Sequence, residues 1–109
     1  GQTRSLCFVD DMVEGLMRLM DSPEDFLGPV NLGNPEEITI KELARKVLKL
    51  EPMINDGAEM IQKPLPEDDP KQRCPDIALA RKKLNWEPTV SISAGLVSTV
   101  NYFRQLGTI

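Results

Sequence analysis

The chain has 109 residues, the size of one domain, and its formal charge of -4 at pH 7 disfavours binding to the polyanionic backbone of a nucleic acid. Apolar residues make up 40% of the sequence, as in ordinary globular domains, and no apolar run reaches the roughly 20 residues of a membrane span. Histidine is absent and the two cysteines, Cys7 and Cys74, lie far apart, so we expect free thiols, a reducing cytoplasm and no transition-metal site.

The first part of the chain predicts a strand followed by a helix. Residues 5–9 (SLCFV) are apolar and β-prone, and either Asp10 or Asp11 can cap a helix that follows them. The helix is expected to end before Asp21, and its apolar stripe is typical of core packing. The stripe has helical spacing and consists of Val13, Leu16, Met17 and Met20.

The middle of the chain predicts a second strand and a second helix. Residues 30–32 are apolar and lie between turn signals at Gly28-Pro29 and Gly33-Asn34-Pro35. Thr39 and Glu42 have the spacing of a capping box, in which each side chain satisfies the backbone amide of the other residue. The helix that they open should end near Leu50, and its apolar face consists of Ile40, Leu43, Ala44, Val47 and Leu48.

The second half of the chain predicts a strand over residues 59–65, a loop and two further helices. Four prolines between residues 64 and 75 exclude long regular structure there, because proline lacks a backbone donor. Asp76 is expected to cap a helix through Leu84, and Ser93 a last helix through Phe103. Trp86 should anchor the packing between these two helices, with its indole N–H on a carbonyl. The whole is a small, helix-rich α/β layer.

The residue types alone do not predict a complete enzyme. A histidine base, a GxSxG turn and a glycine-rich phosphate loop are all missing from the sequence. Arg4, among small polar neighbours, and Arg73, in the proline-rich loop, could together clamp a diphosphate, since each guanidinium offers a planar fork of donors. The alternative is that both are solvated surface charges. The three acids at residues 67–69 are expected to be solvated rather than to bind a cation.

Four segments carry a resemblance to a known family: GQTRSLCFVDDMVEGLMRLM, GPVNLGNPEEITIKELA, PLPEDDPKQRCPDIALARKKLNWEPTVSISAGL and VNYFR. Together they resemble the carboxy-terminal part of the UDP-glucuronate decarboxylases (UDP-xylose synthases), which are extended short-chain dehydrogenases/reductases. The resemblance implies that residues 1–109 are one domain, the helix-rich C-terminal substrate-binding lobe of a longer enzyme, without its Rossmann domain. Gly1 would then lie in mid-protein.

The resemblance also implies a reaction and a cofactor. In this family NAD oxidises UDP-glucuronate at carbon 4, carbon dioxide leaves, and the 4-keto pentose is reduced back to give UDP-xylose. The missing N-terminal domain would bind NAD through a glycine-rich turn and a Tyr-x-x-x-Lys pair, and neither motif occurs here, since Leu106 follows Tyr102 at that spacing. The chain by itself is therefore expected to be inactive, and the full enzyme to be a cytoplasmic homodimer.

The site residues are likewise implied by the resemblance. Arg4 matches the arginine of the family's QTR segment, which faces the diphosphate and the sugar, and Arg73 matches a second arginine near the diphosphate. Gln2, Thr3 and Asp69 are candidates for further polar contacts with the UDP-sugar in the same cleft. Catalytic, cofactor-binding and metal-binding residues are not expected within this chain.

Two alternatives stay open. The chain could be the same lobe of a dTDP-glucose 4,6-dehydratase or of a UDP-sugar epimerase, because substrate choice in these enzymes depends mainly on N-terminal residues. It could also be a non-catalytic module that binds nucleotide sugars. A stable monomer with affinity for UDP would favour such a module, whereas an uncovered apolar face, left where the lobe packs beside a Rossmann domain, would favour the part of a longer enzyme.

Overall fold

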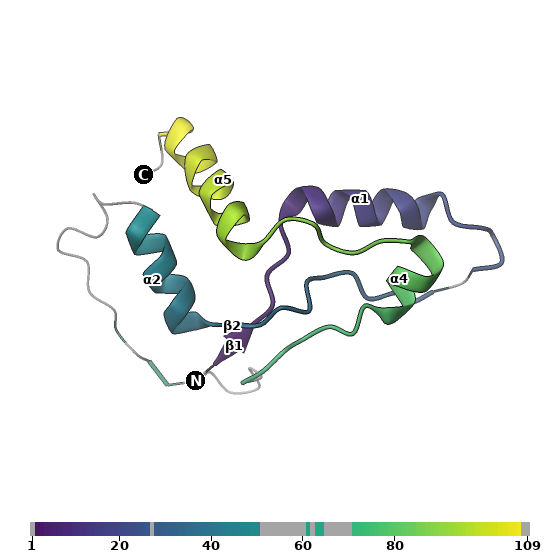
Figure 1. Ribbon diagram of the computed structural model, residues 1–109, viewed down its shortest axis with the longest axis horizontal. Helices are drawn as coiled ribbons and strands as arrows, with labels where there is room; N and C mark the ends of the chain where they lie inside the picture. Colours follow the sequence, from purple (N-terminus) through teal and green to yellow (C-terminus); the bar gives the residue numbers. More distant parts are fainter. Residues whose placement is uncertain (1, 27, 51–60, 62, 65–70, 108–109) are drawn as a thin grey trace.

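The computed structural model of the chain describes residues 2–26, 28–50, 61, 63–64 and 71–107 (Figure 1). Along the described residues two short strands, each followed by a helix, precede two further helices, in agreement with the expected helix-rich α/β class. In chain order the elements are β1 (Thr3–Arg4), α1 (Val9–Met20), β2 (Ile38–Thr39), α2 (Ile40–Leu50), α4 (Ala78–Leu84) and α5 (Ile92–Gln105). None of the described helices is both long and apolar enough to cross a membrane.

The sheet consists of β1 and β2, which pair antiparallel with Thr3 opposite Thr39 and Arg4 opposite Ile38. The strand predicted over residues 5–9 is wrong, because the ladder involves the two residues before it and α1 already begins at Val9. The strand predicted over residues 30–32 is also wrong. Val30 and Leu32 instead pack against the core from an extended segment. Most of the strand predicted over residues 59–65 lies outside the described residues.

Helix α1 begins without a side-chain cap. Its N-cap residue is Phe8, in extended conformation, so the capping roles predicted for Asp10 and Asp11 are wrong. Both aspartates lie inside the first turn, where a negative charge favours the positive end of the helix dipole. The predicted core role of the helix's apolar stripe is wrong within this chain, because Leu16 is 48% exposed and Met20 is 84% exposed.

Helix α2 confirms its prediction and lies beside α5 (Figure 1). The amide of Glu42 donates to Thr39 Oγ1 at 3.0 Å, which is the Thr39 half of the expected capping box, and the helix ends at Leu50. Two polar contacts join the helices. Lys46 Nζ lies 3.1 Å from the hydroxyl of Ser93, and Arg104 Nη2 donates to the carbonyl of Leu50 at 2.9 Å.

Helix α5 is capped by a different serine from the predicted one. It begins at Ile92, and the hydroxyl of Ser91, rather than that of Ser93, accepts from the amide of Ala94 at 3.1 Å. The cap is the residue just before the first helical one, so only the Ser91 hydroxyl is in position to reach that amide. Asp76 does reach the start of α4, where its Oδ1 accepts from Ala78 N at 3.0 Å.

The core lies around α4 and the turn that follows it. Ile77, Ala80, Leu84 and Trp86 form the buried cluster, and Leu19 of α1 packs against it. Asn85, at the end of α4, has a left-handed backbone (φ 50°), and this lets the amide of Trp86 donate back to the carbonyl of Ala80 at 3.3 Å.

Trp86 anchors α1 to the end of α4. Its side chain is 2% exposed, and its indole N–H donates to the backbone carbonyl of Asp11 at 2.9 Å, which confirms the expected carbonyl partner. A methyl group at Gly15 would lie only 3.0 Å from the indole Cε2, so the absence of a side chain there permits the close approach. Both contacts are with α1. Trp86 therefore joins α1 to the end of α4, whereas the sequence predicted that it would pack between the last two helices.

Candidate functional site

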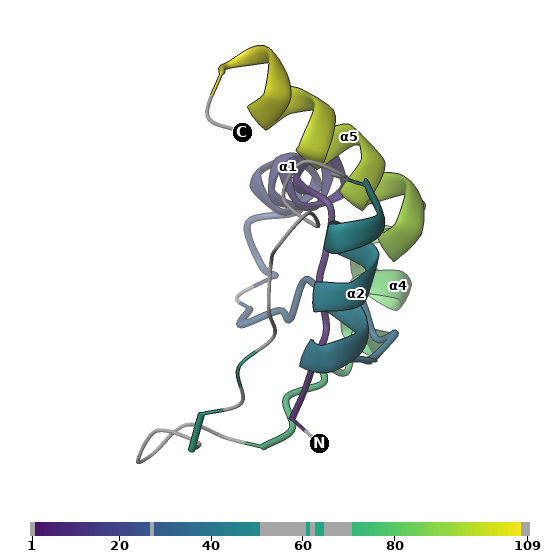
Figure 2. The same ribbon diagram turned by 90° about the vertical axis from the view of Figure 1, so that its left-hand side faces the viewer.

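The candidate site lies at β1, where segments that are distant in the sequence are tied together. The amide of Thr3 donates to the carbonyl of Lys71 at 3.0 Å, and the amide of Ile40 donates to the carbonyl of Gln2 at 3.0 Å. The hydroxyl of Thr3 also donates to Glu37 Oε1 at 3.1 Å. The first residues of the chain therefore meet both the start of α2 and the segment that begins at residue 71, as both ribbon views show (Figures 1 and 2).

The two predicted arginines lie on segments that these contacts hold side by side. Arg4 is half-buried, and its Nη1 donates to the carbonyl of Thr3 at 2.7 Å. Arg73 is exposed, and its segment is held by the bond from Thr3 to Lys71 and by the thiol of Cys74, which lies 3.2 Å from the carbonyl of Pro35. Lys71 adds a third cationic residue to these segments, and Glu37, whose carboxylate accepts from the Thr3 hydroxyl, adds an acidic one. The excess of cations on these segments favours an anionic ligand.

The other predicted site residues are Gln2, Thr3 and Asp69. The backbone of Gln2 and of Thr3 holds the three segments together, and the Thr3 hydroxyl is engaged by Glu37. Asp69 lies outside the described residues. The strand and segment contacts thus bring Gln2, Thr3 and Arg4 next to the segment of Arg73.

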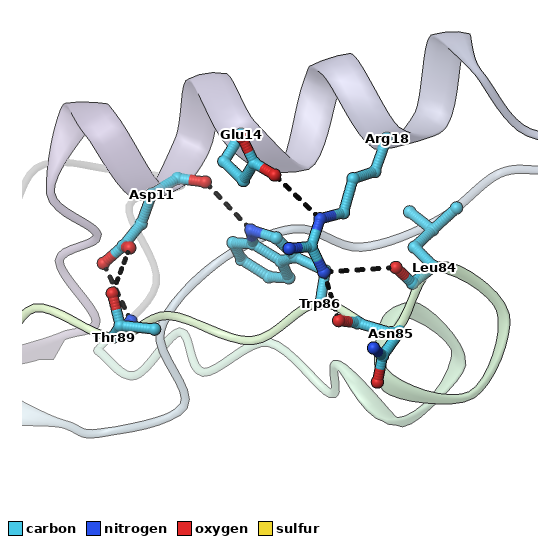
Figure 3. Close-up of polar contacts among 7 residues, drawn as sticks. All are labelled: Asp11, Glu14, Arg18, Leu84, Asn85, Trp86 and Thr89. Carbon is cyan, nitrogen blue, oxygen red and sulfur yellow. Dashed lines mark hydrogen bonds and ion pairs between the residues drawn. The ribbon is translucent and has the colours of Figure 1, made fainter.

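Asp11 is a buried charged residue that the sequence analysis interpreted only as a cap. Asp11 is 7% exposed, and its carboxylate accepts from Thr89 N at 3.1 Å and from Thr89 Oγ1 at 3.0 Å (Figure 3). It also accepts from Val90 N at 2.9 Å. Burial acts to raise the pKa of Asp11, but the two amides and the hydroxyl outweigh it and hold the pKa below its ordinary value. Asp11 is thus ionised at neutral pH, and its carboxylate anchors α1 to residues 89 and 90.

Arg18 makes a second bridge between α1 and the end of α4. Its Nε donates to Glu14 Oε1 at 2.9 Å, and its Nη1 donates to the carbonyl of Leu84 at 3.4 Å and to that of Asn85 (Figure 3). A cation at this point satisfies carbonyls that the helix leaves unpaired. The i, i+4 spacing of Glu14 and Arg18 indicates an ion pair on the helix surface, but it does not indicate the contact of Arg18 with the end of α4.

Two described features, the connection that leads into α1 and the thiol of Cys7, bear on whether these residues could hold NAD or act as a nucleophile. A dinucleotide pyrophosphate needs a glycine-rich turn into a helix N-terminus, whereas the strand-to-helix connection here leads into Asp10 and Asp11. Burial, and then the carboxylate of Asp11, raise the pKa of the Cys7 thiol, and a raised pKa disfavours the nucleophilic thiolate. In the part of the chain that the structure describes, acids, cysteines and histidines do not gather into a metal-binding group.

Comparison with curated proteins finds decarboxylases. The chain is 50% identical over 104 residues to UDP-glucuronic acid decarboxylase 2 of Arabidopsis thaliana, which covers 95% of this chain and 22% of that protein. UDP-glucuronic acid decarboxylase 5 of the same plant is 48% identical over 94% of this chain and 29% of its own length. UDP-glucuronic acid decarboxylase 1 of Xenopus tropicalis is 42% identical over 95% of this chain and 24% of its own length. The chain thus spans between a fifth and a third of these relatives. No protein-family profile matches it.

Solved structures share the fold over a similar portion. The epimerase Mth375 of Methanothermobacter thermautotrophicus superposes with a TM-score of 0.87 at 29% identity, covering 98% of this chain and 31% of that one. The UDP-glucuronic acid 4-epimerase of Bacillus cereus, solved with UDP-glucuronic acid and NAD, has a TM-score of 0.81 at 30% identity. The match covers 96% of this chain and 33% of that one. By sequence the chain is therefore similar to one part of the UDP-glucuronic acid decarboxylases, and by fold it is similar to one part of extended short-chain dehydrogenases/reductases.

Proposed function

We propose that the chain is the nucleotide-sugar-binding domain, residues 1–109, of a UDP-glucuronate decarboxylase. The observation that carries this proposal is identity of 42–50% to UDP-glucuronic acid decarboxylases over 95% of the chain. The fold alone would not choose the reaction, because epimerases and a dehydratase share it.

In this proposal Arg4 and Arg73 hold the diphosphate of the UDP-sugar, with Gln2, Thr3 and Asp69 as further polar contacts. The support is the packing of the Lys71–Arg73 segment against β1, which assembles cationic side chains at one end of the molecule. Charge-assisted hydrogen bonds from a guanidinium to phosphate contribute about 1.5–3 kcal/mol each. An Arg4→Ala variant of the complete enzyme should therefore bind UDP about tenfold or more weakly.

The proposed reaction converts UDP-glucuronate to UDP-xylose and carbon dioxide through a 4-keto sugar. A ketone at carbon 4 makes the carboxylate on carbon 5 a β-keto acid, so the electrons of the breaking carbon–carbon bond pass into the enolate of that ketone. A proton then returns to carbon 5. This chain's residues would bind and orient the UDP-sugar, while NAD, which supplies the hydride chemistry, would be held by the remainder of the enzyme.

The experiment is a product assay on the complete natural enzyme that contains these 109 residues. UDP-glucuronate and dTDP-glucose are supplied separately with NAD, and the products are read by mass spectrometry. Loss of carbon dioxide from UDP-glucuronate supports the proposal. Loss of water from dTDP-glucose would assign a dehydratase. Epimerised UDP-glucuronate of unchanged mass, detected by chromatography, would assign an epimerase, and UDP binding without turnover would assign a non-catalytic module.

The variant Arg4→Lys is the matched control for Arg4→Ala. It keeps the positive charge but loses the planar fork, so an intermediate affinity would indicate bidentate contact with the diphosphate. Equal UDP affinity in the wild-type enzyme and both variants would refute the role of Arg4 while leaving the decarboxylase assignment to the product assay.

A further inference from the structure

Two segments that are far apart in the sequence lie side by side next to the candidate site. Residues 31–35 lead into β2, and residues 74–76 lead toward α4 (Figure 1). The thiol of Cys74 donates to the carbonyl of Pro35 at 3.2 Å, across a separation of 39 residues. We name the contacts between these two segments the clasp. Because Arg73 directly precedes the second segment, the clasp holds the backbone on one side of this arginine.

One contact of the clasp depends on a glycine. Gly33 is buried, and a methyl group in its place would lie 2.9 Å from Cγ of Pro75, which is closer than side-chain carbons approach one another. The absence of a side chain therefore permits the close approach of the two segments. Beside this contact, the side-chain amide of Asn31 donates to the carbonyl of Asp76 at 3.3 Å. A side chain at residue 33 would push the Pro75 segment away.

The support that holds the backbone beside Arg73 also holds the strand of Arg4. The first segment of the clasp continues into β2, where Ile38 pairs with Arg4. On the other side of Arg73, the carbonyl of Lys71 accepts from the amide of Thr3 at 3.0 Å. The backbone around Arg73 is thus held both before and after this residue, and both supports lead to the strand pair that carries Arg4.

We propose that the clasp positions Arg73 toward the diphosphate that Arg4 binds, an inference that rests on the proposed function. Gly33 and Pro75 are then positioning residues, which act on the ligand through the guanidinium of Arg73. An arginine on an unsupported segment loses binding free energy to the ordering of its backbone, whereas on a held segment the backbone is already ordered. The alternative is that the clasp stabilises the fold and has no specific link to Arg73.

The test is a double-mutant cycle on the complete natural enzyme, with affinity for UDP measured by titration calorimetry. Arg73→Ala should weaken UDP binding about tenfold or more, through the loss of charge-assisted hydrogen bonds. Gly33→Ala should weaken it about three- to tenfold, because it moves the segment of Arg73. Combined with Arg73→Ala, it should have no more than about a twofold further effect, because the group through which it acts is gone.

A compensating substitution tests the contact itself. Pro75→Ala removes Cγ, after which the methyl group of Gly33→Ala lies 3.5 Å from Cβ of residue 75, an ordinary distance. The double variant should therefore bind UDP within about twofold of Pro75→Ala alone. Gly15→Ala is the matched control. Its methyl group lies 3.0 Å from the indole of Trp86, outside the clasp, so UDP affinity should stay within about twofold of the wild type.

Asn31→Ala provides the same cycle without a steric clash, and it carries the test if Gly33→Ala does not fold. The substitution removes the donor to the carbonyl of Asp76 and adds no atom to the clasp. It should weaken UDP binding about three- to fivefold in the wild-type enzyme. In the Arg73→Ala enzyme its effect should stay within about twofold.

Three outcomes would overturn the proposal. The first is equal weakening of UDP binding by Gly33→Ala with and without Arg73→Ala, because the clasp would then act on the fold as a whole. The second is a Gly33→Ala defect that Pro75→Ala does not relieve. The third is unchanged UDP affinity in both Gly33→Ala and Asn31→Ala. Coupling of Gly33 to Arg73 in an enzyme that does not release carbon dioxide from UDP-glucuronate would support the clasp and refute the proposed function alone.

Discussion

The Asp11 carboxylate should contribute more to stability than any exposed acid of the chain, and its replacement by asparagine measures that contribution. The side chain accepts hydrogen bonds from two amides and one hydroxyl of residues 89 and 90, at 2.9–3.1 Å. Hydrogen bonds to a charged group contribute about 1.5–3 kcal/mol each, against about 1 kcal/mol for neutral ones. Asparagine keeps the shape and a neutral acceptor, so Asp11→Asn should lower the free energy of unfolding by about 2 kcal/mol.

The assay is equilibrium denaturation followed by fluorescence of Trp86, the single tryptophan, whose indole is bonded to the backbone of Asp11. The matched control is Asp10→Asn, which removes an exposed charge from the same helical turn and should cost about 0.3–1 kcal/mol through the helix dipole alone. A loss of about 2 kcal/mol corresponds to a fall of about 10 °C in melting temperature for a domain of this size.

The same pair of proteins tests the pKa of Asp11. The folded state lowers this pKa below its ordinary value, so the stabilisation is complete above the unfolded pKa, near 4, and is lost as the pH falls through the folded pKa. The stability difference between wild type and Asp11→Asn should therefore be constant above about pH 5 and shrink below pH 4. A difference that does not change with pH, or one no larger than that of Asp10→Asn, would refute the reasoning.

Three further changes test the packing. Ser91→Ala removes the cap of α5 and should cost about 1 kcal/mol in chemical denaturation, whereas Ser93→Ala should be nearly neutral, and the reverse order would contradict the observed cap. Gly15→Ala places a methyl group 3.0 Å from the buried indole and should lower the melting temperature through about 1–3 kcal/mol of overpacking, so an unchanged temperature would contradict that contact. Cys74, which is exposed, should be alkylated well before the half-buried Cys7, and equal rates by mass spectrometry would contradict the assigned burial.

The candidate site was accessible to sequence reasoning only in part. The resemblance identified Arg4 and Arg73 as the residues to consider, but the bond from Thr3 to Lys71 that places their segments together spans most of the chain. Asp11 was interpreted as a helix cap because an acidic residue at the start of a helix commonly accepts a hydrogen bond from a backbone amide of the first turn. Its real partners lie 78 and 79 residues further on, where the sequence offers no signal that marks them.

The sequence by itself determined the helices, since α2 ends at the predicted residue and α4 and α5 lie where apolar spacing places them. Helix periodicity and the Thr39 cap depend on residues within one or two turns, so they can be read locally. Tertiary structure alone decided the pairing of β1 with β2, the burial of Asp11 and the outward direction of the apolar stripe on α1. The reason is that a strand needs a distant partner, and the face that a helix buries depends on the distant segments that pack against it. In α1 that face is the one with Gly15, against which the indole of Trp86 packs.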